Sequence, residues 1–157
     1  MVLKKARILI VDDDRTIAES LNILLQYEGY ETDVAYTGTE AIEQSQKNFY
    51  NLAILDIRLP DIEGTDLLVL LRETSPKMMK IMLTGNPMFE NAVKSLNNGA
   101  DAYLVKPIDM PKLLETIKNK IEEQRAAETA TEGNITAFLQ TRKEKLLESV
   151  GLDGGSI

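Results

Sequence analysis

The sequence predicts an α/β fold in which five parallel strands form a doubly wound sheet with five flanking helices, followed by a C-terminal helical extension. Short apolar runs alternate with segments whose apolar residues recur at helical spacing. The connections are short and crossovers between parallel strands are right-handed, which together favour a doubly wound parallel sheet. Asp12, Asp56 and Lys106 stand close behind three of the apolar runs, as polar residues do at the carboxyl ends of buried parallel strands.

Apolar runs predict strands at residues 7–11, 51–55, 79–83 and 101–105, and residues 31–35 (Glu-Thr-Asp-Val-Ala) are predicted to form a further short strand. Five strands in this alternation favour the sheet order 2-1-3-4-5. The first and third strands then flank the point where the strand order reverses. Open parallel sheets bind ligands outside the carboxyl ends of the strands at such a point.

Helices are predicted between the strands from apolar spacing and from glycines at their ends. They cover residues 15–28, 38–47, a stretch that begins after Gly64, 88–98 and 111–125. Gly29 and Gly99 are expected to end the first and fourth helices. The last of them carries one stripe, which we expect to be buried in the core and which consists of Leu113, Leu114, Ile117 and Ile121.

The chain is predicted to contain one domain over residues 1–125 and an extension over residues 126–157. Residues 126–134 are small and polar, which favours a linker or a frayed helix. A short helix is predicted over residues 135–149. One helix is too little for a helix-turn-helix domain, so direct nucleic-acid binding is not expected.

Composition excludes several classes of function. The 157 residues carry a net charge of −7, which argues against non-specific nucleic-acid binding. The absence of cysteine excludes disulfides and thiolate metal sites, and the absence of histidine excludes histidine-based catalysis. No apolar run has membrane-spanning length, so we expect no membrane partner and a cytoplasmic location.

Carboxylates gather at the predicted switch point of the sheet. Asp12 and Asp13 end the first strand and Asp56 ends the third, while Lys106 follows the fifth. Clustered carboxylates repel one another unless a cation joins them. A hard divalent cation with oxygen ligands fits such a cluster.

These residues also carry a family resemblance. Over residues 5–124 the chain resembles the response-regulator receiver (CheY-like) domain of two-component signal transduction, which has a flavodoxin-like sheet. The shared motifs are the acidic pair Asp12-Asp13, the stretch from Asp56 to Gly64 with its Leu-Pro-Asp loop, Thr84, and Lys106-Pro107. Each motif alone is weak, but they occur together, in the right order and at the right strand ends.

The resemblance implies a phosphoryl-acceptor site that uses Mg²⁺. Asp56 is the implied phosphoacceptor. Asp13, Asp56 and the backbone carbonyl of Arg58 are the implied direct Mg²⁺ ligands, and Asp12 is expected to act mainly through water. Mg²⁺ neutralises the charge that otherwise keeps a carboxylate from attacking a phosphoryl group.

The resemblance also implies a phosphoryl-binding and switch set. Lys106 is expected to pair with Asp56 and then with the phosphoryl group. Thr84 and the backbone N–H of Gly85 are expected to donate hydrogen bonds to it. Tyr103 is the implied switch aromatic, and Pro107 the implied cis-proline.

The implied function is a phospho-acceptor signalling switch. Since the chain has no histidine, a phosphohistidine donor must belong to a sensor histidine kinase on another chain. Phosphorylation is expected to change a surface formed by the fourth helix, fifth strand and fifth helix, where a downstream protein or a second copy binds. Only self-phosphorylation and self-dephosphorylation are expected, so the chain is not predicted to be an enzyme.

Two other readings remain open. A phosphohydrolase of the haloacid dehalogenase type uses an Asp-x-Asp-x-Thr pattern, which residues 12–16 also fit. Asp12 would then be the nucleophile and Asp14 the acid/base. The third reading is an interaction module that is never phosphorylated. Taken as structural residues instead, Asp14 would cap the following helix, and Asp61 would serve the turn beside Pro60.

Overall fold

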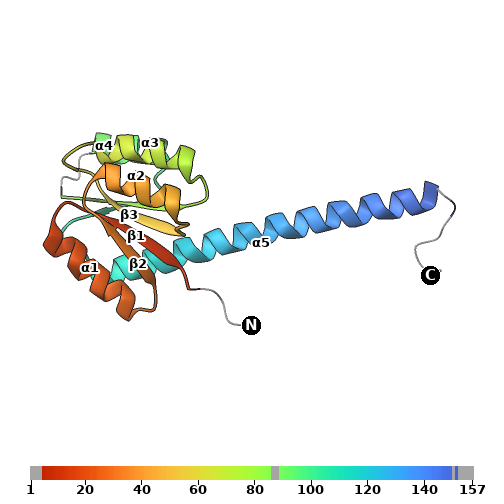
Figure 1. The fold of residues 1–157 in the computed structure, drawn as a ribbon, viewed down its shortest axis with the longest axis horizontal. Coiled ribbons are helices and arrows are strands. Elements are labelled where there is room, and N and C mark those ends of the chain that lie inside the picture. Colours follow the sequence, from red (N-terminus) through yellow and green to blue (C-terminus); the bar gives the residue numbers. More distant parts are fainter. Residues whose placement is uncertain (1–4, 86–88, 150, 152–157) are drawn as a thin grey trace. The chain divides into compact units, whose positions relative to one another are not determined.

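The computed structural model describes residues 5–85, 89–149 and 151. Strands and helices alternate along the chain (Figure 1). Their bounds are β1 Arg7–Val11, α1 Arg15–Tyr27, β2 Glu31–Ala35, α2 Gly38–Lys47, β3 Leu52–Asp56, α3 Gly64–Thr74, β4 Met79–Thr84, α4 Phe89–Asn97, β5 Ala102–Val105 and α5 Met110–Ser149. Up to α5, the predicted elements lie within about one residue of these bounds, a shift that fraying at element ends explains. The first residue of the predicted fourth helix, Met88, lies outside the described residues.

The sheet is five-stranded, and its order is β2-β1-β3-β4-β5 with every neighbouring pair parallel. The predicted fold class and strand order are therefore confirmed. The fold places the carboxyl ends of β1 and β3 side by side at the switch point. Any residue that directly follows these strands lies at that edge.

Each face of the sheet is covered by its own apolar layer. One layer contains side chains of α2 and α3, including Ala41, Leu67 and Leu71. The other contains side chains of α1 and of the first turns of α5, including Leu21 and Ile117. Because both faces are covered, β3 is buried along its whole length, which explains why its sequence is a continuous apolar run rather than an alternating one.

The helix ends follow local rules of capping. The side chain of Asp14 accepts hydrogen bonds from the backbone N–H groups of Thr16 and Ile17 and so caps α1. Gly29 follows α1 with a φ of 97°, a conformation that favours glycine. The predicted capping role of Asp14 agrees with this geometry.

Helix α5 contains residues 126–134, where the sequence favoured a linker or a frayed helix, and residues 135–149, where it favoured a separate helix. The expected new helix start is therefore wrong. Alanine and glutamate are frequent in residues 126–134 and are strong helix formers, which explains the result. Contacts divide the chain into one unit that ends at Ile121 and a second that begins at Glu122; the division at residue 125 stays a prediction.

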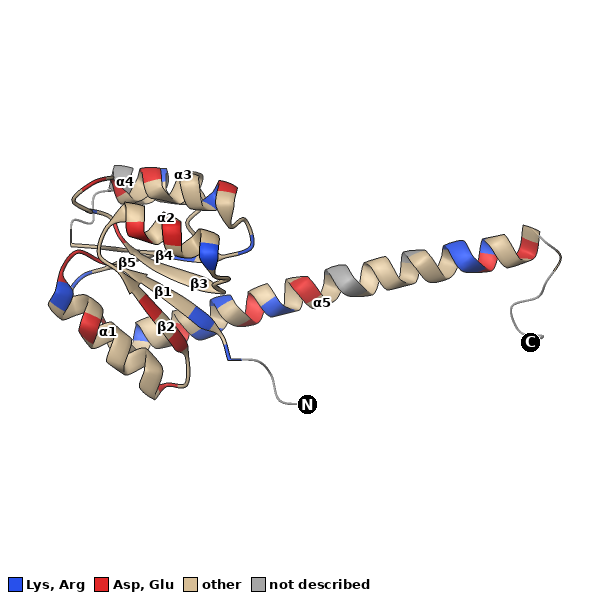
Figure 2. Cartoon of the chain, in the orientation of Figure 1, with Lys and Arg blue, Asp and Glu red and all other residues tan. Residues whose placement is uncertain are grey.

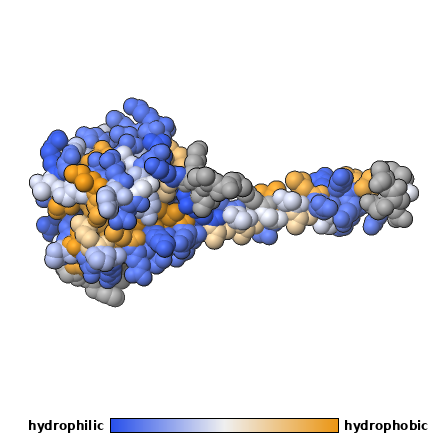
Figure 3. All heavy atoms as spheres, turned by 90° about the horizontal axis from the view of Figure 1, so that it is seen from below, coloured by the Kyte–Doolittle hydropathy of each residue, from blue (hydrophilic) through white to orange (hydrophobic). Residues whose placement is uncertain are grey.

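The helical part of the second unit is mostly exposed. Acidic, basic and uncharged residues alternate along it (Figure 2). Apolar side chains are also exposed there, as the orange spheres in Figure 3 show, and they include Ile135, Leu139 and Leu146. Among the described residues, none of the helices combines the length and the apolar character that crossing a membrane requires.

Candidate functional site

The register of the central strands brings the predicted acidic residues together. Val11, the last residue of β1, pairs with Leu55 of β3. Asp12 and Asp56 are the next residues on these two neighbouring strands, so they lie at the same level of the sheet edge. Both are largely buried, with 2% and 8% of their surface exposed. The topology, rather than any local motif, creates this pair.

Asp13 completes a cluster of three carboxylates. One oxygen from each of Asp12, Asp13 and Asp56 lies within 4.8 Å of the other two. Three oxygen donors at this separation, two of them buried and one exposed, suit a hard divalent cation that keeps part of its water shell. The donor set therefore fits the hard divalent cation that the sequence predicted, and the Mg²⁺ that the family resemblance implied.

Lys106 supplies a positive charge beside the cluster. Its Nζ lies 3.1 Å from Asp12 Oδ2 and 3.5 Å from Asp56 Oδ1. Burial alone would lower the pKa of Lys106, but the hydrogen bond to Asp12 and the charge of Asp56 outweigh it, so the pKa is raised. Lys106 therefore stays charged and bridges two carboxylates across the switch point.

One lysine does not fully compensate the carboxylates. Burial, followed by the charge of Asp12, raises the pKa of Asp56, whereas Lys106 and the backbone N–H of Arg58 act in the opposite direction. The balance indicates that Asp56 binds a proton more readily than an exposed aspartate. A divalent cation would relieve this repulsion.

The remaining predicted site residues lie around the same edge. Thr84 ends β4 and is fully buried, and its carbonyl accepts a hydrogen bond from the backbone N–H of Lys106 at 2.6 Å. Gly85 is exposed, and apart from its chain neighbours no heavy atom of the described residues lies within 4 Å of the position that a Cβ would take. The Lys106–Pro107 peptide bond is cis.

Tyr103 lies on β5 with its ring packed against the α2/α3 apolar layer. Its hydroxyl is buried, and it has no hydrogen-bond partner within the part of the chain that the structure describes. Burying a hydroxyl group without a hydrogen-bond partner destabilises the folded state. The unpaired hydroxyl therefore favours another position of the Tyr103 ring if space opens elsewhere.

The loop over residues 57–63 follows Asp56 and begins with the backbone of Ile57 and Arg58. It closes on itself through a hydrogen bond from Gly64 N–H to the carbonyl of Ile57, 2.8 Å, and through an antiparallel bridge between Arg58 and Glu63. A Cβ on Gly64 would lie 2.6 Å from the carbonyl oxygen of Asp56. Only glycine allows the start of α3 to approach the acidic site so closely.

Sequence reasoning missed the partners of Asp61. Instead of serving only the local turn, its carboxylate accepts hydrogen bonds from the backbone N–H groups of Gly38 and Thr39 and from Thr39 Oγ1. These bonds, that of the Thr39 side chain above all, lower the pKa of Asp61 to about 2. The partners are more than twenty residues away in the sequence. The one sequence feature that could have suggested them is the predicted helix start at Gly38, whose first backbone N–H groups need acceptors.

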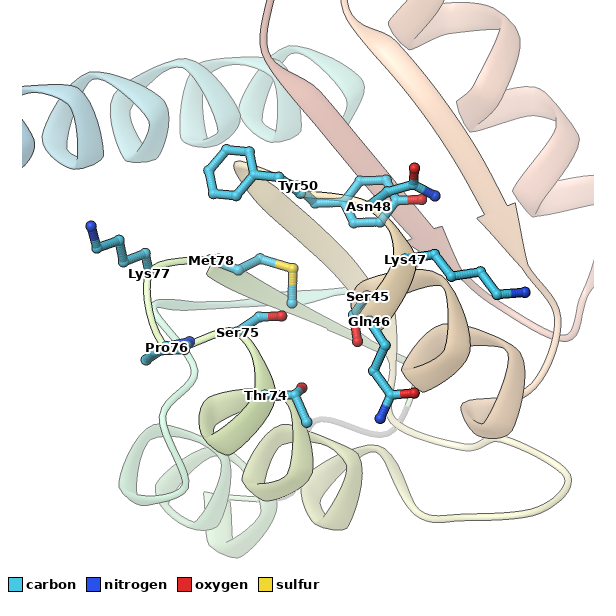
Figure 4. Close-up of a pocket in the computed structure, with 11 residues that line it drawn as sticks. Ser45, Gln46, Lys47, Asn48, Tyr50, Thr74, Ser75, Pro76, Lys77 and Met78 are labelled. Carbon is cyan, nitrogen blue, oxygen red and sulfur yellow. The ribbon is translucent and has the colours of Figure 1, made fainter.

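A hollow of about 400 Å³ lies at the opposite ends of the strands from the acidic site, where β3 and β4 begin (Figure 4). It is lined by residues 45–50 and 74–78, and none of the predicted site residues belongs to it. The side chains of Lys47 and Lys77 extend in different directions, as Figure 4 shows, so their charges do not converge. The chemistry of the acidic site is thus separate from this hollow.

A comparison with known families identifies the fold and the motifs together. Residues 8–118 match the response regulator receiver domain. The chain belongs to this family. The acidic cluster, Lys106 and the sheet order had already indicated this domain of two-component response regulators.

Solved receiver domains resemble this one closely. A receiver domain protein (CheY-like) from Methanospirillum hungatei JF-1 is 48% identical, with a TM-score of 0.77 over 79% of this chain and 99% of that chain. The response regulator protein TrrA from Thermotoga maritima, solved in complex with Mg²⁺-BeF, is 36% identical, with a TM-score of 0.67 over 73% of this chain and 98% of that chain.

Curated relatives are longer proteins. The response regulator MprA from Mycobacterium ulcerans (strain Agy99) is 34% identical over 128 residues, which are 78% of this chain and 55% of the relative. This chain spans about half the length of the first curated relatives it matches. The similarity therefore concerns their receiver domains.

Proposed function

We propose that this receiver domain is a phospho-acceptor switch whose Asp56 receives a phosphoryl group in a Mg²⁺-dependent reaction. The donor is a phosphohistidine on a separate sensor histidine kinase, since the chain contains no histidine. An oxygen of Asp56 forms the new bond to phosphorus as the phosphorus–nitrogen bond of the donor breaks. The product is an acyl phosphate.

The observation that carries this proposal is the arrangement of Asp12, Asp13, Asp56 and Lys106 at one sheet edge. Asp12 and Asp56 are held on adjacent strands, and Lys106 lies within 3.5 Å of both. A buried carboxylate beside an ammonium group and two further carboxylates provides a nucleophile together with the charges that a phosphoryl group requires.

Asp13, Asp56 and the carbonyl of Arg58 are the groups that would hold Mg²⁺, with Asp12 acting mainly through water. When bound, Mg²⁺ would offset the negative charge of the carboxylates and of the phosphoryl oxygens. The Mg²⁺-BeF complex of the Thermotoga maritima relative supports this choice of metal. In this chain Lys106 is positioned to neutralise a phosphoryl oxygen, and Gly85, which has no side chain, leaves room for the group.

The output is expected on the face formed by α4, β5 and α5. A hollow of about 180 Å³ lies at β5 and the start of α5 beside Tyr103, and Val105, Ile108 and Lys112 help to line it. Thr84 ends β4, which lies between β3 with Asp56 and β5 with Tyr103. Movement of Thr84 towards the phosphoryl group, followed by the Tyr103 ring, would change the surface that a downstream protein or a second copy binds.

The competing hydrolase mechanism finds less support in the geometry. That mechanism needs Asp14 as a free acid/base, but its carboxylate accepts two backbone N–H groups at the start of α1. Asp12, its nucleophile, is hydrogen-bonded to Lys106 and to the backbone N–H of Asp14. We therefore propose that turnover is limited to phosphorylation and dephosphorylation of Asp56 itself.

Intact mass measured after incubation with Mg²⁺ and acetyl phosphate tests the proposal. Wild type should gain one phosphoryl group, and the gain should disappear in Asp56→Ala and when the metal is chelated. A label that survives in Asp56→Ala but is lost in Asp12→Ala, together with repeated turnover of a phosphate ester, would favour the hydrolase. No label on wild type under any of these conditions would favour the unphosphorylated interaction module.

A further inference from the structure

The backbone N–H groups at the amino terminus of α2 donate hydrogen bonds to acceptors from two separate segments of the chain. The first N–H groups of a helix have no partner within the helix. Thr37 Oγ1 accepts from Glu40 N–H at 3.1 Å, which is an ordinary N-cap. The N–H groups of Gly38 and Thr39 donate instead to the two oxygens of Asp61, at 2.8 and 2.9 Å. Asp61 thus acts as a second cap that comes from the loop after the phosphoacceptor.

The contact involves packing as well as hydrogen bonds. A Cβ on Gly38 would overlap Ile62 Cγ2, so the side chain of Ile62 occupies the space that glycine leaves free. Ile62 also packs against the α2/α3 apolar layer. Residues Asp61 and Ile62, which we call the loop clamp, therefore hold the loop against α2 by three hydrogen bonds and one close apolar contact.

The same loop contains the expected carbonyl ligand of the metal. Arg58 is held on one side by its bridge to Glu63, and only Leu59 and Pro60 separate it from Asp61. Leu59 is itself packed against the apolar layer. The path of the backbone at Arg58 is therefore restrained at both ends of a very short segment.

We infer that Asp61 is a positioning residue for metal binding: it fixes the loop that presents the Arg58 carbonyl by anchoring it to the amino terminus of α2. This inference rests on the proposed function, because it takes Mg²⁺ as the ligand of the acidic site. Asp61 does not touch the metal. It lowers the cost of binding by holding a ligand in place beforehand, as groups behind the direct ligands do in other metal sites.

Coupling of this kind is reciprocal. If the clamp favours Mg²⁺ binding, then Mg²⁺ binding must favour the clamp by the same factor. The backbone N–H groups of Gly38 and Thr39 should therefore exchange with solvent more slowly when Mg²⁺ is present. A role of Asp61 confined to the stability of α2 does not predict this dependence on the metal.

The test compares Mg²⁺ dissociation constants measured by calorimetry on the full chain. In Asp61→Asn an amide group replaces one of the accepting oxygens, and Mg²⁺ affinity should fall about tenfold. Thr39→Val removes only the Oγ1 donor and should give a smaller loss. It also keeps the test usable if Asp61→Asn does not fold.

Two controls separate positioning from simpler effects. Thr37→Val removes the ordinary cap of α2 and leaves the loop untouched. Glu63→Gln removes one negative charge from the same loop, where Glu63 lies 4.0 Å from Lys94 and caps nothing with its side chain. Both should keep Mg²⁺ affinity within about twofold of wild type, below the effect expected at a group behind the direct ligands.

The inference is overturned if Asp61→Asn binds Mg²⁺ as tightly as wild type, or if Thr37→Val or Glu63→Gln weakens binding equally. It is also overturned if Mg²⁺ leaves exchange at Gly38 and Thr39 unchanged. If wild type binds no Mg²⁺ at all, the proposed function fails together with it, a result that is distinct from failure of the clamp alone.

Discussion

At the scale of single residues, Asp56 is the point where stability and function conflict. It is buried beside Asp12, and among the described residues Lys106 is the cation paired with both carboxylates. Such a group favours ligand binding at the expense of the unliganded fold. The metal-free protein should therefore become more stable when this charge is removed.

We predict that Asp56→Asn raises the free energy of unfolding of the metal-free protein at pH 7, on the order of 1 kcal/mol. The folded-state pKa of Asp56 lies above its ordinary value of 3.8, so the folded state binds the proton more strongly and its stability falls as pH rises through that interval. The gain from Asn should be fully present above the folded-state pKa, fade as pH falls from that value to 3.8, and be absent at lower pH. Urea unfolding at a series of pH values, with chelator present, measures it, and a loss of stability in Asp56→Asn at pH 7 would contradict the account.

Asp14 shows how neighbouring aspartates take different roles. It caps α1 through two backbone N–H groups and belongs to none of the ion pairs described in the structure. We predict that Asp14→Ala lowers the free energy of unfolding by about 1 kcal/mol and leaves phosphorylation of the chain intact. Thermal unfolding and intact mass measure the two effects, and loss of labelling in a folded Asp14→Ala protein would favour the hydrolase mechanism.

At the scale of elements, the loop after β3 joins three structures: the acidic site, the start of α3 and the start of α2. Gly64, at the end of this loop, has no room for a side chain. A Cβ there would lie 2.6 Å from the Asp56 carbonyl oxygen and 2.7 Å from Ile57 Cα, both of which are backbone atoms. A larger residue would have to displace the backbone at Asp56 and Ile57.

We predict that Gly64→Ala lowers the free energy of unfolding by about 1–3 kcal/mol, because the backbone around Asp56 must shift. Gly133→Ala is the matched control. Gly133 lies inside α5, and beyond its own helix backbone and chain neighbours no heavy atom of the described residues lies within 4 Å of a Cβ there. The same substitution should therefore leave stability unchanged or raise helix content. Circular dichroism and denaturant unfolding distinguish the two, and equal effects at both positions would refute the steric reason.

At the scale of the whole molecule, the first unit contains the apolar layers of the sheet and all the residues of the acidic site. Side chains after residue 125 are largely exposed among those that the structure describes. We predict that a chain ending at Arg125 keeps its unfolding free energy within about 1 kcal/mol of the full chain and keeps its Mg²⁺ affinity. Loss of cooperative unfolding in the shortened chain would show that the extension supports the domain.

The fold and the acidic site were predictable from sequence because apolar runs mark β1 and β3 and because parallel topology forces their carboxyl ends together. Asp12, Asp56 and Lys106 could thus be placed at one edge without coordinates. The Asp61 contact was not predictable, since it depends on how a loop meets a helix end distant in sequence. The burial of Lys80 was not predictable from sequence either. Lys80 interrupts an apolar strand, yet it is only 3% exposed, and its Nζ donates a hydrogen bond to the Met78 carbonyl.

The most direct test of the central claim is to locate the phosphoryl group on the chain. Wild type labelled with acetyl phosphate and Mg²⁺ is reduced with borohydride, which converts an aspartyl phosphate to homoserine, and the peptides are sequenced by mass spectrometry. The account predicts homoserine at position 56 in the labelled protein and none without Mg²⁺. Homoserine at position 12, or at neither position in a protein that carries the label, would contradict it.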